Sequence, residues 1–299
     1  MITRAIGKHL PFRLLQRLAR QIRVQLGPRE AIVPLAGPAA LVWIYWKPSW
    51  KTGIIAHALR TRPGAFVDIG ANVGQTLADF LATGADTPYW GFEPNVRCLS
   101  FLSDLIDASG FHDVELVPVG LWNQIGLRRL YMTSDSPTDQ TASLRPELRP
   151  ASIRRQQWIW SAPFDDVMKS MDEPALALIK IDVEGSELEV LQGMMRTLQR
   201  DPPPILCEVL LADPAADHAL YRQRTEALYA LLRQLDYRIF RVRFTPDRVF
   251  HGLAEVPFFP VDSWTPERAH ECDYLFAPAS FPLPAMAGVE AGRKNSLSP

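Results

Sequence analysis

The stretch Val67-Asp68-Ile69-Gly70-Ala71-Asn72-Val73-Gly74 decides the fold of this chain. The apolar residues 65–69 run up to a glycine turn, and a helical pattern follows, which predicts a buried strand, a tight turn and a helix. The next apolar run, Trp90-Gly91-Phe92, ends at the carboxylate of Glu93. Open α/β sheets hold adenosine-containing ligands beyond strand ends of this kind.

The spacing of glycines in the turn narrows the choice of ligand. A turn that binds a dinucleotide has glycine at its first, third and sixth positions, so that the backbone can approach the pyrophosphate. Counted from Gly70, these positions hold Gly70, Asn72 and Gln75. Only the first is glycine, so the turn fits an adenosine ligand without phosphates, of which S-adenosylmethionine (SAM) is the common one.

The acids and glycines around the turn would then contact this ligand. SAM carries positive charge at its sulfonium and amino groups, which suits the carboxylate of Asp68. Glu93, at the end of the next strand, can accept hydrogen bonds from both ribose hydroxyls. Gly70 and Gly74 lack a Cβ and let the turn pass close to a ligand. The alternative is that Asp68 and Glu93 only cap the helices that follow them.

The rest of the chain alternates short apolar runs with amphipathic stretches, which predicts a mostly parallel sheet with helices on both faces. We expect seven strands, near residues 65–69, 88–92, 114–119, 176–182, 204–210, 236–243 and 272–277. Helices are expected near residues 51–60, 74–83, 95–108, 186–199 and 217–235. Between the third and fourth strands we expect a hairpin over residues 120–132 and a long loop over 133–163, which in a compact domain is usually functional or disordered.

Residues 50–280 are expected to form the ligand-binding domain, followed by a flexible tail over 281–299. In the first part, residues 1–49, the apolar residues from Phe12 to Leu26 recur at a helical period with arginines on the opposite face, which predicts a basic amphipathic helix. Such a helix can lie on an anionic membrane or pack on the domain with its basic face in solvent. The aromatic residues 42–46 are expected to cover the domain.

A second polar motif follows a buried strand and reads Lys180-Ile181-Asp182-Val183-Glu184-Gly185-Ser186-Glu187. The fourth strand of such a sheet adjoins the ligand crevice, so Asp182 and Glu184 should face the reacting end. Ser186 is expected to cap the next helix, with Glu189 as its capping-box partner. The alternative is that these acids only favour the start of that helix, and this is the better interpretation for Glu187 and Glu189.

Two charged residues lie inside apolar runs of neighbouring strands, Lys180 in the fourth and Glu208 in the fifth. A charge in such a run is costly to bury unless it is paired or used. The two residues could therefore form a structural ion pair, or an acid–base pair with shifted pKa values.

In their order along residues 50–245, the motifs VDIGANVG, WGFEPN, VPVGLWN and LIKIDVEGSELEVLQGM resemble those of FkbM-type SAM-dependent methyltransferases. The resemblance implies the class I methyltransferase fold, which is Rossmann-like, with a mostly parallel seven-stranded sheet. It also implies O-methylation of a sugar, glycolipid or natural product. The SAM contacts that it implies come from Asp68, Gly70, Asn72, Gly74, Glu93, Gly120, Leu121, Asn123, Asp182 and Glu184. Residues 162–166, APFDD, depart from the usual family pattern, so the substrate-side loop is expected to differ.

Methyl transfer from a sulfonium mainly requires that the acceptor oxygen is aligned with the methyl carbon and that water is excluded. A hydroxyl acceptor loses its proton, so a base within hydrogen-bond reach helps. The candidate catalytic residues are Asp182 and Glu208 as bases and Lys180 as a holder of charge or substrate. Alternative bases are His57 and His112. A divalent metal on Asp182, Glu184 or Asp213 is conceivable, but the spacing is weak evidence, and no metal is expected.

Composition limits the partners and the setting. The formal net charge is −1, which gives no sign of a general nucleic-acid binder. The three cysteines are far apart, which argues against a disulfide scaffold or zinc site and favours the cytoplasm. No apolar run reaches the roughly 20 residues of a membrane span. We therefore expect a small-molecule or glycolipid acceptor and a cytoplasmic enzyme, with the basic helix as a possible contact to the inner face of the membrane.

Two other classes of function fit parts of the sequence. An NAD-dependent oxidoreductase would share the sheet and the acidic ribose contact, but it needs a phosphate-binding turn. A noncatalytic SAM-binding or scaffold protein would keep Glu93 and tolerate the loss of Asp182. Ligand binding and turnover, measured separately, distinguish these classes.

Overall fold

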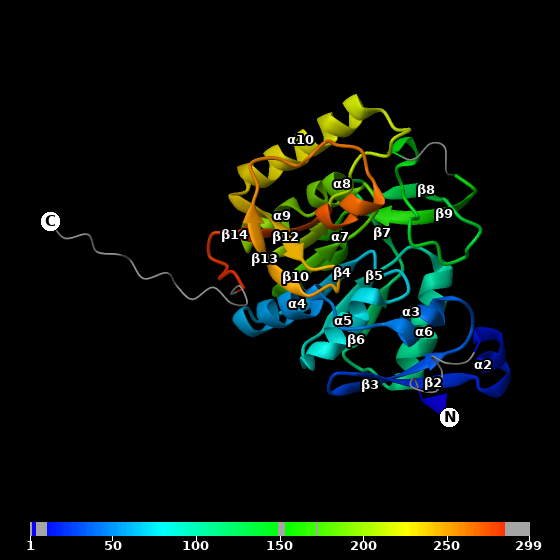
Figure 1. Cartoon of the computed structure of the whole chain (residues 1–299). Coiled ribbons are helices and arrows are strands. Elements are labelled where there is room, and N and C mark those ends of the chain that lie inside the picture. Colours follow the sequence, from blue (N-terminus) through cyan, green and yellow to red (C-terminus); the bar gives the residue numbers. More distant parts are fainter. Residues whose placement is uncertain (1, 4–10, 149–152, 172, 285–299) are drawn as a thin grey trace.

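The structure, a computed structural model, describes residues 2–3, 11–148, 153–171 and 173–284. An eight-stranded sheet runs through its centre in the order β13, β12, β14, β11, β10, β4, β5, β6 (Figure 1). The strands are β4 Ala65–Ile69, β5 Tyr89–Phe92, β6 Val114–Val117, β10 Leu176–Ile181, β11 Ile205–Glu208, β12 Tyr237–Phe244, β13 Phe250–Glu255 and β14 Asp273–Pro278. β13 and β14 run against the other strands, and the neighbours from β11 to β6 are all parallel.

The predicted α/β class with a mostly parallel sheet is confirmed, but the predicted number of seven strands is wrong. The additional strand is β13, which pairs with β12 at the sheet edge. Its sequence, FHGLAE, has a glycine in the middle and no β-branched residue, so it carries little strand signal.

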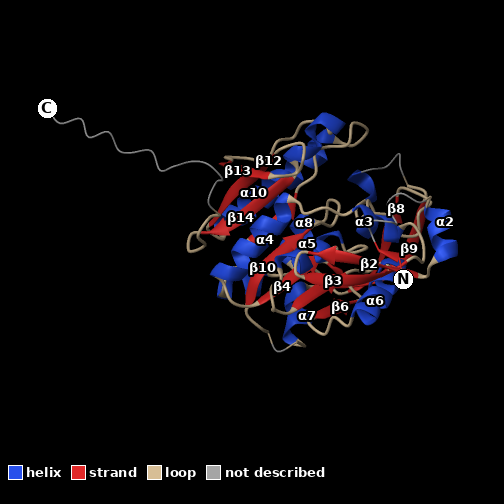
Figure 2. Ribbon diagram, turned by 60° about the horizontal axis from the view of Figure 1, so that its bottom comes forward, coloured by secondary structure: helices blue, strands red, loops and turns tan. Residues whose placement is uncertain are grey.

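Helices cover both faces of the sheet, in two layers that Figure 1 shows on opposite sides of it, and Figure 2 shows the same helices and strands from another side. One layer consists of α3 Ala39–Tyr45, α4 Trp50–Thr61, α5 Gln75–Thr83 and α6 Val96–Ser109. The other consists of α7 Phe164–Lys169, α8 Glu187–Gln192, α9 Met195–Arg200 and α10 His218–Gln234. Strand β10 is buried along its whole length because both of its faces are covered, which explains its continuous apolar sequence.

The helix expected over residues 186–199 is two short helices, α8 and α9, which meet at Gly193-Met194. The chain passes very close to another loop at this point. A Cβ on Gly193 would lie 2.4 Å from the carbonyl oxygen of Trp122. The break in the helix therefore accommodates the segment after Gly120.

The predicted helix over residues 12–26 is wrong in its second half. Helix α2 spans only Phe12–Leu18, and β2 Gln21–Leu26 forms an antiparallel hairpin with β3 Arg29–Pro34, with β1 Ile2–Thr3 beside β2. In β2 the buried residues alternate with exposed ones, which is the period of a strand with one buried face. The apolar residues Ile22 and Leu26 also fit a helical period, which misled the sequence interpretation.

The N-terminal hairpin packs on the helical layer of the central sheet rather than standing apart. β3 lies along α6, and Arg29 forms a two-pronged ion pair with Asp113 at 2.5 and 2.7 Å. Helix α3 buries Trp43, whose indole nitrogen donates a hydrogen bond to the carbonyl of Val73 in the glycine turn. This segment therefore supports the turn directly.

The hairpin expected over residues 120–132 does not form. A small sheet of order β7–β9–β8 takes its place, with β7 Gly120–Leu121, β8 Gly126–Met132 and β9 Arg155–Ala162. β7 and β8 both pair with β9, which lies within the predicted long loop, instead of with each other.

Of the tail expected over residues 281–299, the part from residue 285 lies outside the described residues. Phe281 is buried, and its ring lies edge-on to that of His57. Within the part of the chain that the structure describes, no helix is both long and apolar enough to cross a membrane.

Candidate active site

A cavity of about 490 Å³ opens beyond the carboxyl ends of β4, β5 and β10. This is the point at which the chain order of the sheet reverses, where open α/β sheets bind their ligands. Of the residues that the sequence singled out, those that line the cavity are Gly70, Asn72, Glu93, Gly120, Leu121, Lys180, Asp182, Glu184 and Glu208. Asp68, Gly74 and Asn123 do not belong to its lining.

The glycines of the turn allow close packing within the protein. Gly70 has φ +82°, and a Cβ there would lie 1.9 Å from the carbonyl oxygen of Asp182. A Cβ on Gly74 would lie 2.7 Å from the ring of Trp43. The glycines therefore allow the close approach of the β10 end and of α3, and their contact with a ligand stays a prediction.

Glu93 accepts hydrogen bonds from the neighbouring backbone and also lines the cavity. Its position therefore permits both predicted roles, the cap and the contact with a ligand. Its carboxylate oxygens accept hydrogen bonds from the backbone N–H groups of Asn72, at 2.8 Å, and Asn95, at 2.7 Å. Burial raises the pKa of Glu93 to about 7, against the effect of these two donors. Each carboxylate oxygen has a second lone pair, which a ligand hydroxyl could use.

Lys180 joins the two motifs beneath the cavity. Its Nζ lies 3.1 Å from Asp68 Oδ1, 3.4 Å from Asp182 Oδ2 and 3.0 Å from the carbonyl oxygen of Gly70. Burial by itself would lower the pKa of Lys180, but the charges of Asp182 and Asp68 outweigh it and raise this pKa. Asp68 is fully buried and also accepts a hydrogen bond from Tyr89 Oη, so its place is under the cavity, where it holds Lys180.

The predicted partnership of Lys180 with Glu208 gives way to one between Glu208 and Asp182. Glu208 donates a hydrogen bond to Asp182, because the Asp182 charge and then burial raise the pKa of Glu208 well above its usual value. Burial would also raise the pKa of Asp182, but Lys180 and this hydrogen bond outweigh it and lower that pKa. The pair therefore titrates as a unit and shares one proton, for which Glu208 has the higher pKa.

The turn after Asp182 has an uncommon backbone conformation and is stabilised by a hydrogen bond to an acidic side chain. Glu184 lines the cavity and has φ +56°, an uncommon value for a residue with a side chain. The predicted capping box does not form, because Ser186 makes no side-chain cap bond. Glu187 instead accepts a hydrogen bond from the backbone N–H of Gly185 at 2.9 Å, and burial raises the pKa of Glu187 to about 7.

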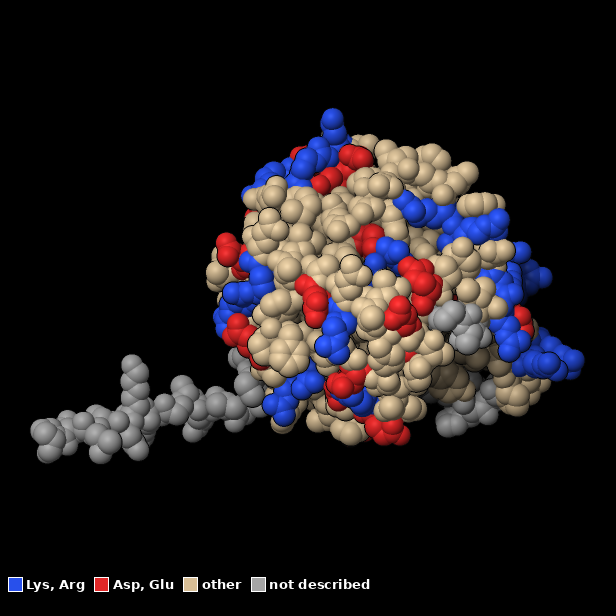
Figure 3. Space-filling view, turned by 90° about the horizontal axis from the view of Figure 1, so that it is seen from above, with Lys and Arg blue, Asp and Glu red and all other residues tan. Residues whose placement is uncertain are grey.

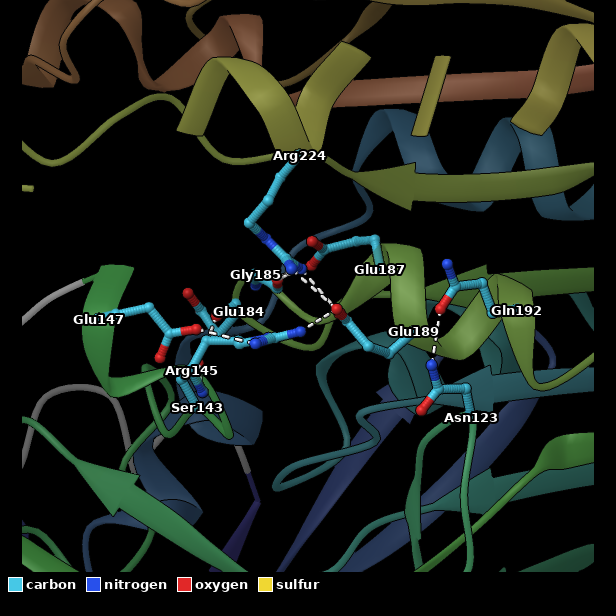
Figure 4. Close-up of polar contacts among 10 residues, drawn as sticks. All are labelled: Asn123, Ser143, Arg145, Glu147, Glu184, Gly185, Glu187, Glu189, Gln192 and Arg224. Atoms are coloured by element: carbon cyan, nitrogen blue, oxygen red, sulfur yellow. Dashed lines mark hydrogen bonds and ion pairs between the residues drawn. The ribbon is translucent and has the colours of Figure 1, made fainter. Parts of the chain in front are cut away.

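Two arginines that the sequence did not single out converge on Glu189 beside this turn (Figure 4). Arg224 donates to both oxygens of Glu189, at 2.8 and 2.7 Å, and to the carbonyl oxygen of Gly185. Arg145 donates to Glu189 and, at 2.9 Å, to Glu147. Glu189 therefore ties the motif after β10 to α10 and to the segment between β8 and β9.

Asn123 is not among the residues that line the cavity, although the sequence predicts that it contacts the ligand. It donates a hydrogen bond to Gln192 Oε1 at 2.7 Å, on the side of α8 that Figure 4 shows. The predicted neighbours Gly120 and Leu121 do line the cavity, because β7 lies at its wall.

The segment from Thr133 to Leu144 closes one side of the cavity and is ordered by one acid. Asp139 accepts hydrogen bonds from the backbone N–H groups of Thr133, Ser134 and Thr141. The carbonyl of Asp139 accepts from the Asn72 side chain at 3.2 Å. The predicted long loop therefore contributes to the site, with Gln140, Ala142 and Leu144 in the lining.

Several lining residues come from segments that the sequence did not connect with the site. They are Tyr45, Trp46, Lys47, Ser49, Lys51, Asp79 and Arg248. Asp79 accepts hydrogen bonds from the hydroxyls of Ser49 and Thr52, at 3.0 and 2.6 Å, and a charge within a predicted amphipathic helix was the available signal for it. The other residues depend on how α3, α4 and the β12–β13 hairpin pack, which no local pattern reveals.

The alternative bases His57 and His112 lie outside the cavity lining, and so does Asp213, one of the three candidate metal ligands. His57 Nε2 contacts the carbonyl oxygen of Pro282 at 2.6 Å, and neither His57 nor His112 lines the cavity. Asp213 caps the turn at Ala215. Within the described ranges, no cluster of three or more His, Cys, Asp or Glu residues is arranged to hold a metal ion.

A comparison with protein families assigns the greater part of this chain. The model of the methyltransferase FkbM domain matches residues 68–239, from the end of β4 into β12. The chain belongs to the FkbM methyltransferase family. The matched region contains Glu93, Lys180, Asp182 and Glu208, and the resemblance found in the sequence is thereby confirmed. A search of curated proteins found no match.

Solved structures with a similar fold are methyltransferases. An FkbM methyltransferase from Methylobacillus flagellatus is 21% identical, with a TM-score of 0.42, and the match covers 72% of this chain and 43% of that chain. A SAH-bound methyltransferase from Podospora anserina is 13% identical, with a TM-score of 0.37 and coverage of 75% and 82%. A SAM-dependent O-methyltransferase from Thermotoga maritima is 9% identical, with a TM-score of 0.36 and coverage of 83% and 72%. The chain thus matches less than half of the FkbM structure.

Proposed function

We propose that this FkbM family member is a SAM-dependent O-methyltransferase that transfers a methyl group to a hydroxyl of a sugar, glycolipid or natural product. The observation that carries the proposal is the cavity at the switch point of the sheet, which brings Glu93 and the Asp182–Glu208 pair to one site. Family membership supports the reaction, and the carboxylate pair supports a hydroxyl acceptor, because such an acceptor must lose a proton.

The residues of the cavity fit SAM. Its lining contains Glu93, Asp182 and Glu184, which suit a ligand with sulfonium and ammonium charges. Asn72 Oδ1 and Ser186 Oγ are buried and have no hydrogen-bond partner among the described residues, so both are ready to bind a polar ligand. Glu93 would hold the ribose, and the segment Gly120–Leu121 would lie against the adenine.

SAM, when bound, supplies a methyl group on a good leaving group, so the protein has little covalent chemistry to perform. Asp182 would orient the acceptor hydroxyl and accept its proton as the oxygen attacks. The lowered pKa of Asp182 makes its carboxylate a weak base. The proton that Asp182 shares with Glu208 is held within the same carboxyl pair. Lys180 stays charged and acts as a positioning residue for Asp182, rather than as a proton carrier.

Turnover and ligand affinity of an Asp182→Asn variant test this proposal. We expect transfer of labelled methyl groups from SAM to a panel of sugars and glycolipids, and about a hundredfold slower transfer by the variant. Its affinity for S-adenosylhomocysteine (SAH) should change far less. Asp166→Asn, at a half-exposed carboxylate on α7, is the matched control that should keep full activity.

Equal losses of turnover and SAH affinity would contradict the assignment of Asp182 as the base. Transfer to amines but to no hydroxyl would contradict O-methylation. SAH binding without transfer to any acceptor would favour a noncatalytic SAM-binding protein.

A further inference from the structure

The outer face of the small β7–β9–β8 sheet exposes large apolar side chains. Trp158 and Trp160 on β9 are 60% and 53% exposed, and Leu127 on β8 is 64% exposed. The antiparallel register pairs Leu127 with Trp160 and Arg129 with Trp158, so these four side chains share one face. Their neighbours Leu130 and Ile159 are buried on the other face, as the alternation of a strand requires.

One isoleucine extends this face. Ile125 lies two residues before Leu127, just ahead of β8, and is 61% exposed. Ile153 precedes β9, but the alternation along the strand puts it with Ile159 on the other face. Four large apolar side chains gathered on one face are unusual on a protein that has no partner there.

The charge of the same elements has one sign. Residues 120–132 and 153–162 contain Arg128, Arg129, Arg154 and Arg155 and no acidic residue, in a chain whose net charge is −1. The guanidinium of Arg129 lies 4.2 Å from the ring centre of Trp158, so a positive charge and an indole ring lie side by side on this face. Figure 3 shows basic side chains gathered along the right-hand edge of the molecule, the side on which Figure 1 places α2 as well as β8 and β9.

We propose that this face docks on an anionic phospholipid surface. Indole and aliphatic side chains insert at the boundary between headgroups and acyl chains, and arginines bind the headgroup phosphates. A second copy of the chain is a poorer occupant, because facing copies would bring the arginines together. A nucleic acid or charged glycan would use the arginines and indoles but would leave Leu127 and Ile125 unburied.

The position of the face links it to the site. Leu130, on the opposite face of β8, lines the cavity, so the small sheet has the cavity on one side and the proposed membrane on the other. A membrane-bound acceptor would be within reach of the cavity, a consequence that rests on the proposed function. Lipid docking itself does not depend on that function.

Sedimentation of the full chain with lipid vesicles tests the proposal. We expect binding to phosphatidylglycerol vesicles, weaker binding to phosphatidylcholine vesicles, and release by salt. The variant Trp158→Ser/Trp160→Ser should bind at least tenfold more weakly. Arg129→Gln/Arg154→Gln should lose about fivefold per arginine. Trp264→Ser, at another exposed tryptophan, and Arg60→Gln/Arg97→Gln are the matched controls and should bind as the unchanged protein does.

Absence of sedimentation with either vesicle would overturn the proposal. So would equal binding to both lipids that the arginine variants leave unchanged. Light scattering that finds a dimer, dissolved by Trp158→Ser/Trp160→Ser, would assign the face to a second copy. Binding of an oligonucleotide or heparin without binding of vesicles would assign it to a soluble polyanion. Circular dichroism and urea unfolding, measured on every variant, verify that the fold is intact.

Discussion

At the scale of single residues, the site rests on buried charges that compensate one another. Lys180 contacts Asp68, Asp182 and the carbonyl of Gly70, and so fixes the ends of β4 and β10 to each other. Glu208 can lie beside Asp182 because it keeps its proton. The charge of Lys180 and the proton of the Asp182–Glu208 pair thus allow all three carboxyl groups, including that of Asp68, to remain in a largely apolar setting.

Lys180→Met removes the cation and leaves Asp68 and Asp182 without it. Breaking a buried ion pair from one side typically costs about 3–5 kcal/mol, so we expect a loss of this size in the free energy of unfolding. Asp68→Asn combined with Lys180→Met should recover part of it. Urea unfolding measures both variants, and a loss below about 1 kcal/mol for the single variant would show that Lys180 is not a structural counter-ion.

Glu93 should make the binding of SAH depend on pH. Its pKa of about 7 means that the carboxylate, the better acceptor for ribose hydroxyls, forms as the pH rises through 7. The affinity for SAH should therefore increase about tenfold from pH 6 to pH 8. Glu93→Gln cannot titrate, and it should bind more weakly and with little dependence on pH over this range. The same slope in Glu93→Gln, followed by calorimetry, would assign the titration to another group.

At the scale of elements, close backbone approaches decide where strands and helices end. The turn after β4 leaves no room for a Cβ on Gly70, since Asp182 of the neighbouring strand fills that space. The φ value of +82° also excludes most other residues. The two motifs of the sequence are thus in direct contact through their backbones.

A pair of alanine substitutions separates the cost of a positive φ from the cost of a Cβ that has no room. Gly110 has φ +66° and open space around its Cβ position, whereas Gly70 has the same kind of φ and a backbone oxygen 1.9 Å away. Gly110→Ala should lower the free energy of unfolding by about 1 kcal/mol. Gly70→Ala should cost several times more, because β4 and β10 must separate. Similar losses in urea unfolding would show that the contact with Asp182 is relieved easily.

Elements with a strong period were predicted from the sequence, and elements that depend on distant partners were not. Strands β4, β5 and β10 and helices α4, α5, α6 and α10 lie close to their expected places because each combines a clear apolar pattern with flanking turn residues. β2 was misread as helix because Ile22 and Leu26 satisfy both periods. The sequence predicts a loop at β9, because the strands that pair with it, β7 and β8, are separated from it by more than twenty residues along the chain.

At the scale of the whole molecule, the cavity is assembled from four parts of the chain. The N-terminal segment around α3, the small sheet and the β12–β13 hairpin each add a wall to the strand ends of the central sheet. The sequence predicted the floor of the site, because Glu93, Lys180, Asp182 and Glu208 lie in or beside strands with clear patterns. Of the walls it predicted the Gly120–Leu121 segment, but not residues such as Lys51 and Arg248, since their place depends on tertiary packing.

The central claim is that this cavity binds SAM, and calorimetric titration with SAH tests it most directly. The purified full chain should bind SAH saturably at one site, and a parallel titration with NAD should give no heat of binding. Asp166→Asn should bind SAH as the unchanged protein does, and Glu93→Gln should bind it more weakly. Clear binding of NAD with none of SAH would contradict the claim, and so would SAH affinity that Glu93→Gln leaves unchanged.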